Sequence, residues 1–469
     1  MKFCLTLAAI ALLGAISLEA HAQQPWLADR QYGEGIGVRV GNLEFHPGIA
    51  GEVGYDSNYY LRAPSEDPIA VYRFRVTPSA SLSTLGPQRS GVGGGGQAAP
   101  PTLIFRTDFY AALNAIIAAD SKHSSEVSDQ AINADFGYNL ALTLFPAARV
   151  GEDVYFNYVR AIQPSNDTDA QNAFNRDTMR YGAGVAWRPG GGLFDWRLGY
   201  EGSYNYFEKS NFAALNNYTN AVNVRGRWRF LPRTAVLYDG SYTWITYPHS
   251  EASSVGTQND GEIMRSRIGL NGLITSRFSA LAMIGWAGTF YDTKTNATPQ
   301  EFDSITAQAE LKWFISAPQE SLNASAPVGL SYASIGYTRD VQNSYLGNFY
   351  RRDRGYAGVS YLLGGVFVAS LNAGLSNLAF PTSYFAPGTV GAGPNTVQQD
   401  AFSEQRFDAS LFTEYRLSNT FGLNATVNYE QNITDVQIRT TPGAPLGDPT
   451  NDYLAYSRWQ VFLGARYFL

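Results

Sequence analysis

The strongest constraint on the fold is an alternation of apolar and polar residues with a period of two. In the last segment of the chain, Trp459, Val461, Leu463, Ala465, Tyr467 and Leu469 take every second place, and Arg458, Gln460, Gly464 and Arg466 lie between them. A helix would gather residues three and four apart on one face, so the pattern indicates β-strands with one apolar and one polar face. The same alternation recurs in residues 103–114, 132–144, 222–230 and 406–415.

The alternation predicts about 18 strands, each longer than the roughly 9 to 11 residues that a tilted strand needs to cross a bilayer. Their expected starts lie near Glu44, Ile69, Thr102, Asp129, Val150, Arg176, Leu193, Leu215, Arg233, Asp260, Arg277, Phe302, Ala326, Leu346, Gly365, Gln399, Thr420 and Asn451. We therefore predict an all-β fold, an antiparallel transmembrane β-barrel over residues 44–469. Residues 23–43 are expected to form a short periplasmic segment, too short for a plug domain.

The connections between the predicted strands alternate in length. Tight turns are expected at Pro146–Arg149, Pro189–Gly192, Pro232–Arg233, Thr275–Ser276, Leu363–Gly364 and Leu417–Asn419, and longer loops at Gln163–Asn175, Pro248–Asn259, Tyr291–Glu301, Pro381–Val397 and Thr434–Thr450. Membrane barrels have short periplasmic turns and long external loops, so both chain ends are expected in the periplasm. The stretch Gly86–Pro101 breaks this rule. We interpret it as a flexible Gly/Pro-rich connection, because it lacks the Lys-Ser/Thr of a phosphate-binding loop.

Residues 1–22 have the pattern of a signal peptide. One cation, Lys2, precedes an apolar run, and Ala20-His21-Ala22 fits a small-residue cleavage site, so we expect cleavage near Ala22-Gln23. The chain has one cysteine, Cys4, and its removal with this peptide would leave neither a disulfide nor a cysteine metal site. After Ala22 there is no apolar run of roughly 18 residues, the length that a membrane-spanning helix needs.

The composition fits a barrel in the bacterial outer membrane, in contact with its lipid and lipopolysaccharide. Of 469 residues, 14% are aromatic and only 16% are charged, and the mean hydropathy is −0.20. A barrel spreads its apolar residues along every strand, whereas a soluble domain concentrates them in a core. The formal net charge of −6 argues against nucleic acid as a partner.

The polar faces of the predicted strands contain most of the arginines. The pore-lining candidates are Arg73, Arg75, Arg106, Arg180, Arg197, Arg225, Arg227, Arg229, Arg265, Arg267, Arg352, Arg354, Arg406, Arg416, Arg458 and Arg466. The acids assigned to the same faces are Glu52, Asp56, Asp108, Asp135, Asp195, Glu201, Glu310, Asp408 and Glu414.

Three arginine clusters outnumber the nearby acids, which favours anion binding there. They are Arg225/Arg227/Arg229, Arg265/Arg267 and Arg352/Arg354. The alternative is structural, because arginines and acids on neighbouring strands also pair with each other and stiffen a barrel wall. Three tyrosines, Tyr110, Tyr155 and Tyr356, fall on faces assigned inward and are candidates for stacking on sugar rings. Most other aromatic residues fall on the apolar faces, as interfacial girdles do.

The histidines argue against an enzyme. After the signal peptide they are His46, His123 and His249, and none has metal-ligand spacing with another. His123 precedes Ser124, but sequence adjacency does not make a catalytic triad. We expect no catalytic residue, no metal and no cofactor. Asp167 and Asp169 are candidates for binding calcium or bridging lipopolysaccharide, although an ordinary acidic loop is the preferred interpretation.

The segment Gly35–Ile49, followed by Gly54-Tyr55-Asp56-Ser57-Asn58, resembles the start of the β-barrel porins found with bacterial exopolysaccharide export systems. The resemblance in motif covers about thirty residues and implies a large barrel that takes a polymer from periplasmic export machinery to the cell surface. It transfers no catalytic or binding residue to this chain.

These observations predict a conduit for secretion of an anionic or mixed-charge exopolysaccharide. The alternatives are a diffusion porin for small anions and a structural or adhesion barrel with a closed lumen. The last strand is also expected to act as an assembly signal through Trp459, Val461, Leu463, Tyr467 and Leu469, with Leu in place of the usual terminal Phe.

Overall fold

The computed structural model describes residues 37–84, 102–127, 132–162, 175–189, 193–249, 258–292, 301–315, 331–344, 348–364, 366–385, 397–438 and 452–469. The expected signal peptide, most of the expected periplasmic segment 23–43 and the whole expected connection Gly86–Pro101 lie outside these residues.

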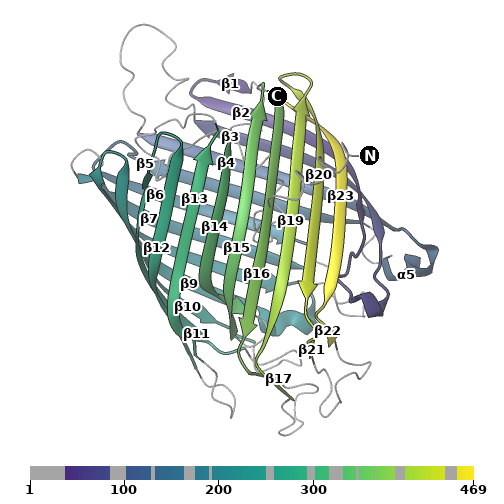
Figure 1. Ribbon diagram of the computed structural model, residues 1–469. Coiled ribbons are helices and arrows are strands. Elements are labelled where there is room, and N and C mark those ends of the chain that lie inside the picture. Colours follow the sequence, from purple (N-terminus) through teal and green to yellow (C-terminus); the bar gives the residue numbers. More distant parts are fainter. Residues whose placement is uncertain are drawn as a thin grey trace.

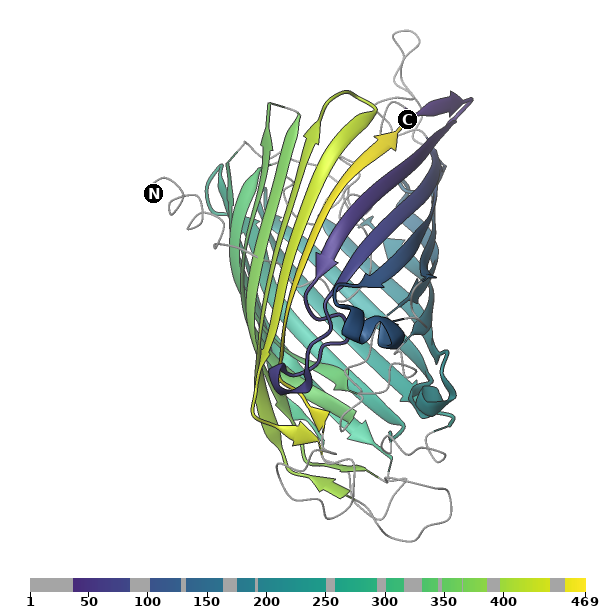
Figure 2. The same cartoon turned by 90° about the vertical axis from the view of Figure 1, so that its right-hand side faces the viewer.

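Eighteen long strands form one closed antiparallel barrel (Figures 1 and 2). They are β2 (Leu43–Asp56), β3 (Val71–Thr84), β4 (Leu103–Ala118), β5 (Ile132–Leu144), β6 (Val150–Ala161), β7 (Arg176–Trp187), β8 (Phe194–Phe207), β9 (Asn217–Leu231), β10 (Thr234–Thr246), β11 (Gly261–Leu273), β12 (Phe278–Tyr291), β13 (Asp303–Phe314), β14 (Tyr332–Ser344), β15 (Asn348–Leu363), β16 (Phe367–Phe380), β19 (Phe402–Arg416), β20 (Phe421–Ile433) and β23 (Tyr456–Phe468). Each pairs with the next, and β23 closes the barrel on β2, from Gly48 opposite Phe468 to Asp56 opposite Gln460. The predicted fold and strand number are confirmed, and β14 and β23 differ most by starting several residues later than predicted.

Short elements occupy the ends of the barrel. They are β1 (Val38–Val40), η1 (Pro64–Glu66), η2 (Ser121–His123), α5 (Ser124–Val127), η5 (Ser210–Leu215), β17 (Ser383–Phe385), β18 (Val397–Gln399), β21 (Gln437–Ile438) and β22 (Asp452–Tyr453). β1 extends β2 as a hairpin, which turns at Gly41 with a φ of +61°. None of the helices in the described residues is long and apolar enough to cross a membrane.

The six predicted tight turns all join strands at the end of the barrel where β2 starts and β23 ends. This is the periplasmic end, since membrane barrels place short turns there. The prediction that one connection alone breaks the rule was wrong: β13 ends at Phe314 and β14 starts at Tyr332, which is a second long connection at this end. The apolar residues at Ala326–Leu330 had extended the predicted strand too far toward the N-terminus.

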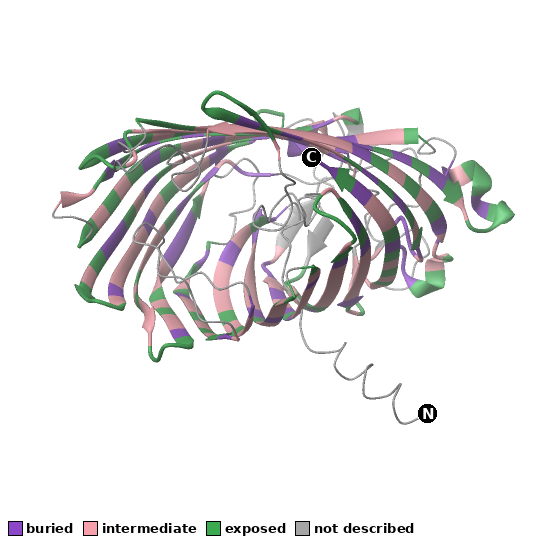
Figure 3. Cartoon of the chain, turned by 90° about the horizontal axis from the view of Figure 1, so that it is seen from above, coloured by how far each residue is buried: buried purple, intermediate pink, exposed green. Residues whose placement is uncertain are grey.

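The two faces of the wall differ in chemistry, and the burial of successive residues alternates along the strands (Figure 3). On the outer face, exposed aliphatic side chains form a middle band that includes Ile49, Val53, Leu113, Leu198, Ile284, Leu375 and Leu463. Aromatic side chains flank it, with Phe194, Trp228, Phe278, Trp313 and Tyr467 toward the periplasmic end and Tyr204, Tyr206, Tyr218, Phe290 and Trp459 toward the external end. An aliphatic band between two aromatic girdles is the surface of an outer-membrane barrel.

Candidate functional site

The inner face of the wall carries the predicted arginines. The register places them opposite the exposed apolar face, on β3 (Arg73, Arg75), β4 (Arg106), β7 (Arg180), β8 (Arg197), β9 (Arg225, Arg227, Arg229), β11 (Arg265, Arg267), β15 (Arg352, Arg354), β19 (Arg406, Arg416) and β23 (Arg458, Arg466). Some of these inner-face side chains are not accessible to a solute, however. Those of Arg354 and Arg466 are only 5% and 3% exposed.

Most of these guanidinium groups are held by carboxylates. The N···O distances are 2.5 Å for Arg75–Glu52, 2.6 Å for Arg197–Asp153, 2.8 Å for Arg227–Asp195, 2.9 Å for Arg352–Asp340, 2.6 Å for Arg354–Asp408 and 2.5 Å for Arg406–Glu404. Arg267 pairs with Asp239 and Arg466 with Glu414. The pairs of Arg197 with Asp153, Arg352 with Asp340 and Arg354 with Asp408 are bidentate. Bidentate pairs are strong and fix the position of both groups.

Of the three arginine clusters predicted to outnumber their acids, Arg352/Arg354 is balanced, because Arg352 pairs with Asp340 and Arg354 with Asp408. In the other two clusters Arg227 pairs with Asp195, while Arg225 and Arg267 share Asp239, so the arginines still outnumber these acids. The acids that sequence reasoning missed are Asp153, Asp239, Asp340, Glu404 and Glu430, and all lie on the inner face. Asp239, on β10, lies opposite both Arg225 and Arg267. Asp153, Asp239 and Asp340 stand on other strands than the arginines they bind, so only the register between strands reveals them. Glu404 instead binds Arg406, two residues away on β19.

Glycines allow inner side chains to reach the second strand away. The Arg197 guanidinium lies over Gly184 of β7 and binds Asp153 of β6, where a Cβ at Gly184 would lie 2.6 Å from Arg197 Nη2. The Arg354 guanidinium crosses Gly374 of β16 in the same way to bind Asp408 of β19.

Two further bridges repeat this geometry. Tyr356 crosses Gly336, and its hydroxyl donates to Glu310 Oε2 at 3.0 Å. Asn424 Nδ2 donates to Glu52 Oε1 at 2.9 Å across Gly464 of β23. A glycine on the middle strand leaves the inner surface flat, so a network of polar contacts runs across several strands.

The three inward tyrosines pack against glycines as well. Their partners on the neighbouring strands are Gly137 for Tyr110, Gly182 for Tyr155 and Gly336 for Tyr356. An aromatic ring over a strand glycine fills the gap that the missing side chain leaves. Tyr110 is only 6% exposed, which leaves little ring surface for a sugar, whereas the other two tyrosines are partly accessible.

The external end of the β14–β15 hairpin folds inward. Pairing between β13 and β14 stops at Ala307 opposite Arg339, while β14 and β15 stay paired to Ser344 opposite Asn348. Beyond that point, Val341 and Phe349 are 0% and 6% exposed and form one apolar cluster with Ile263, Ala287 and Phe302.

Ile263 and Ala287 belong to the inner faces of β11 and β12, so the hairpin end rests against the inside of the wall. Arg265 of β11 also donates to the backbone oxygen of Val341. The hairpin thus narrows the external mouth. Beside it, Tyr350, Phe380 and Phe402 form a row of rings with centroids 5.2 and 4.6 Å apart. Sequence reasoning missed this infolded hairpin because its residues alternate like those of any other strand pair.

The predicted His123-Ser124 pair lies outside the lumen. His123 is in an external loop, with Nδ1 2.9 Å from Glu126 Oε1 and Nε2 3.3 Å from Asp67 Oδ2, whereas the Ser124 hydroxyl donates to the Ser121 carbonyl. The hydrogen bond from Lys122 holds the pKa of Asp67 below its usual value. The part of the chain that the structure describes contains no group of three or more His, Cys, Asp or Glu able to hold a metal ion.

Asp167 and Asp169 lie outside the described residues. The predicted assembly residues Trp459, Val461, Leu463 and Tyr467 are exposed on the outer face of β23. Leu469 follows this strand, and its backbone N–H donates to the Pro47 carbonyl at 3.1 Å.

Comparisons with known proteins assign no family, since no protein family and no curated protein matches the sequence. Among solved structures, OccK5 (OpdH) of Pseudomonas aeruginosa is 8% identical, with a TM-score of 0.42 over 91% of this chain and 98% of that one. Pseudomonas aeruginosa OpdQ is 10% identical, with a TM-score of 0.41 over 92% and 99%. The FrpB iron transporter from Neisseria meningitidis is 8% identical, with a TM-score of 0.41 over 90% and 81%. Likenesses this weak assign no solute to the chain.

Proposed function

We propose that this outer-membrane barrel is a channel through which an exopolysaccharide leaves the cell. The observation that carries the proposal is the pairing of arginines with carboxylates along the inner wall. A wall of paired charges offers hydrogen-bond donors on its guanidinium groups and hydrogen-bond acceptors on its carboxylates. A polymer rich in hydroxyl groups exchanges hydrogen bonds with such a wall, and no single site holds it strongly enough to stop its passage.

The dimensions of the barrel support a polymer conduit. Barrels of 16 to 18 strands are wide enough to leave an aqueous channel. No separate plug domain occupies the lumen within the described ranges. The infolded β14–β15 hairpin narrows the external mouth. An extended polysaccharide chain would pass through such a mouth, whereas a folded protein would not. The substrate in this proposal is an anionic or mixed-charge polysaccharide delivered by periplasmic export machinery.

Deletion of the gene followed by staining for surface polymer tests the proposal. We expect the polymer to disappear from the surface and to return on complementation with the wild-type gene. Complementation with a variant that lacks hairpin packing, Val341→Asp, should restore export while changing polymer length or yield. Unchanged polymer at the surface of the deletion strain would refute the conduit.

A diffusion porin for small anions is the second candidate. It is favoured by Arg225, whose side chain is 63% exposed and lies 3.9 Å from Asp239, the carboxylate that Arg267 also binds. A loosely held guanidinium in an aqueous lumen attracts anions. Planar bilayers distinguish the candidates: a porin gives steady conductance with anion preference, which Arg225→Ser should lower. A barrel with no conductance would instead support the structural or adhesion alternative.

A further inference from the structure

Glu152 is an unusual residue of the outer face. The register places it opposite Val185, between Val150 and Val154, on the face that carries the exposed apolar side chains. In the described strands it is the one charged side chain on the periplasmic half of this face. It is exposed, and it forms no hydrogen bond or ion pair with residues that the structure describes.

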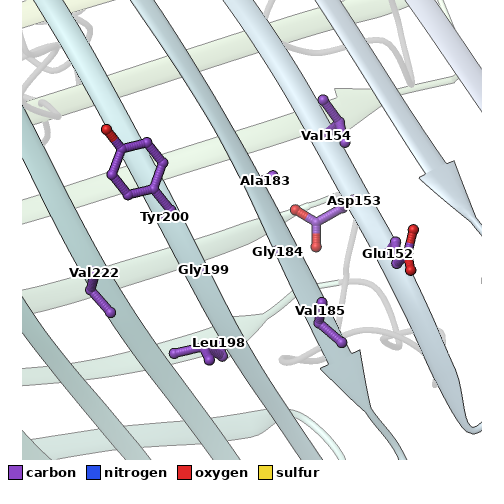
Figure 4. A pocket seen from close by; sticks show the side chains of 10 residues that line it. All are labelled: Glu152, Asp153, Val154, Ala183, Gly184, Val185, Leu198, Gly199, Tyr200 and Val222. Atoms are coloured by element: carbon purple, nitrogen blue, oxygen red, sulfur yellow. The ribbon is translucent and has the colours of Figure 1, made fainter.

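An apolar groove of about 330 Å³ adjoins this carboxylate (Figure 4). It is lined by Glu152, Val154, Ala183, Val185, Leu198, Tyr200 and Val222, with Asp153, Gly184 and Gly199 also along it. The small side chain of Ala183 leaves a depression among larger neighbours. On the inner side, the Arg197 guanidinium lies over Gly184 and Gly199. The groove therefore belongs to the outer surface and not to the lumen.

The groove lies at the level of the periplasmic leaflet. Trp187 is opposite Val150 at the periplasmic end, one pair of outer-face residues from Glu152. Tryptophans of such girdles lie at the headgroup level of a bilayer. Glu152 thus lies just inside the headgroup layer, and the groove runs from it toward the acyl chains.

We infer that this groove binds a phospholipid with a primary amine in its headgroup, phosphatidylethanolamine. The ammonium group would lie against the Glu152 carboxylate, and an acyl chain would fill the depression at Ala183. Two observations support this occupant. The groove faces hydrocarbon, which is the environment that its valines and leucine require. The isolated negative charge complements an ammonium group and repels an anionic headgroup.

Native mass spectrometry of the purified barrel tests the site. The barrel is incubated with phosphatidylethanolamine and phosphatidylglycerol that have identical acyl chains. We expect wild type to retain the ethanolamine lipid several-fold more than the glycerol lipid. Glu152→Gln should abolish this preference, and Glu152→Lys should reverse it. Ala183→Leu should lower retention of both lipids, because it fills the groove.

Ala309→Leu is the matched control, since Ala309 is an exposed outer-face residue of β13 away from the groove. It should retain lipid as wild type does, and gel mobility with and without heating verifies that each variant is folded. Equal retention by wild type and Glu152→Gln would overturn the proposal. So would a stable oligomer that Ala183→Leu converts to monomers, because the groove would then be an interface between copies. The readout involves no polymer, so its outcome is independent of the proposed channel function.

Discussion

Arg458 of β23 binds Asp56 of β2 with two hydrogen bonds across the seam that closes the barrel. Arg458 Nε donates to Asp56 Oδ1 at 2.9 Å and Nη2 to Oδ2 at 2.5 Å. The Asp56 side chain is fully buried, and it also accepts a bond from Gln460 and lies 3.7 Å from Arg73 of β3. One carboxylate therefore joins the first two strands of the barrel to the last.

Breaking this seam pair should destabilise the whole barrel. Removal of one partner from a buried ion pair costs about 3 kcal/mol, because the other charge remains buried. We expect that loss in the free energy of unfolding for Arg458→Ala, measured by urea unfolding in micelles. Arg106→Ala is the control, since its partly exposed pair with Asp108 should contribute about 1 kcal/mol or less. An equal loss in both variants would contradict a special role for the seam.

A side chain at Gly374 should release Arg354. A Cβ there would lie 2.0 Å from Arg354 Nη2, so Gly374→Val forces the guanidinium away from Asp408. We expect lower resistance to urea and a channel with greater preference for anions, measured as a shift in reversal potential. Gly355→Ala is the control, because a Cβ at Gly355 meets nothing within 4 Å. Similar behaviour of the two variants would show that the bridge over Gly374 is unimportant.

The infolded hairpin should control the width of the external mouth. Val341→Asp places a charge in the apolar cluster with Ile263 and Phe349, which costs too much to keep the hairpin packed. We expect larger single-channel conductance in planar bilayers. Val359→Ser, at an outer-face position of the same hairpin, should leave conductance unchanged. A Val341→Asp channel with wild-type conductance would mean that the hairpin does not limit flow.

The contact between the β2–β3 and β4–β5 loops should weaken in acid. Hydrogen bonds from Lys122 and His123 lower the pKa values of Asp67 and Glu126 below their ordinary 3.8 and 4.5. A lowered carboxylate pKa contributes stability that is present above the unfolded-state value and is lost as pH falls through the folded-state value. Protection factors for amide exchange in these loops, which correct for the intrinsic rate at each pH, should stay constant down to about pH 4.5 and fall below it. Glu126→Gln should show faster exchange already at neutral pH.

The last residue should matter for insertion. Leu469 extends the alternate apolar set of β23, and its backbone bonds to Pro47 at the seam. We expect Leu469→Asp to abolish assembly, measured as loss of the heat-modifiable barrel from outer-membrane fractions, whereas Leu469→Phe should assemble normally. Normal assembly of the aspartate variant would remove Leu469 from the assembly signal.

The strand number, the order of the strands and the two faces of the wall followed from the sequence. Alternation is a local property, because successive side chains of a strand point to opposite faces whatever lies beside them. The apolar residues of β23 are therefore visible as an outer face before any partner is known. The short turns are also visible in the sequence, and they showed which end of the barrel is periplasmic.

The partners of inner-face residues depended on tertiary structure. Arg354 meets Asp408 only because β15, β16 and β19 align with Gly374 between them. The pairing of Asp56 with Arg458, the packing of the infolded Val341 and the groove at Ala183 also depend on how neighbouring strands align. Such contacts depend on the stagger between strands, and a shift of one residue would send every side chain to the other face. The sequence alone determined that this chain forms a barrel, and the stagger of its strands decided which charges are paired within it.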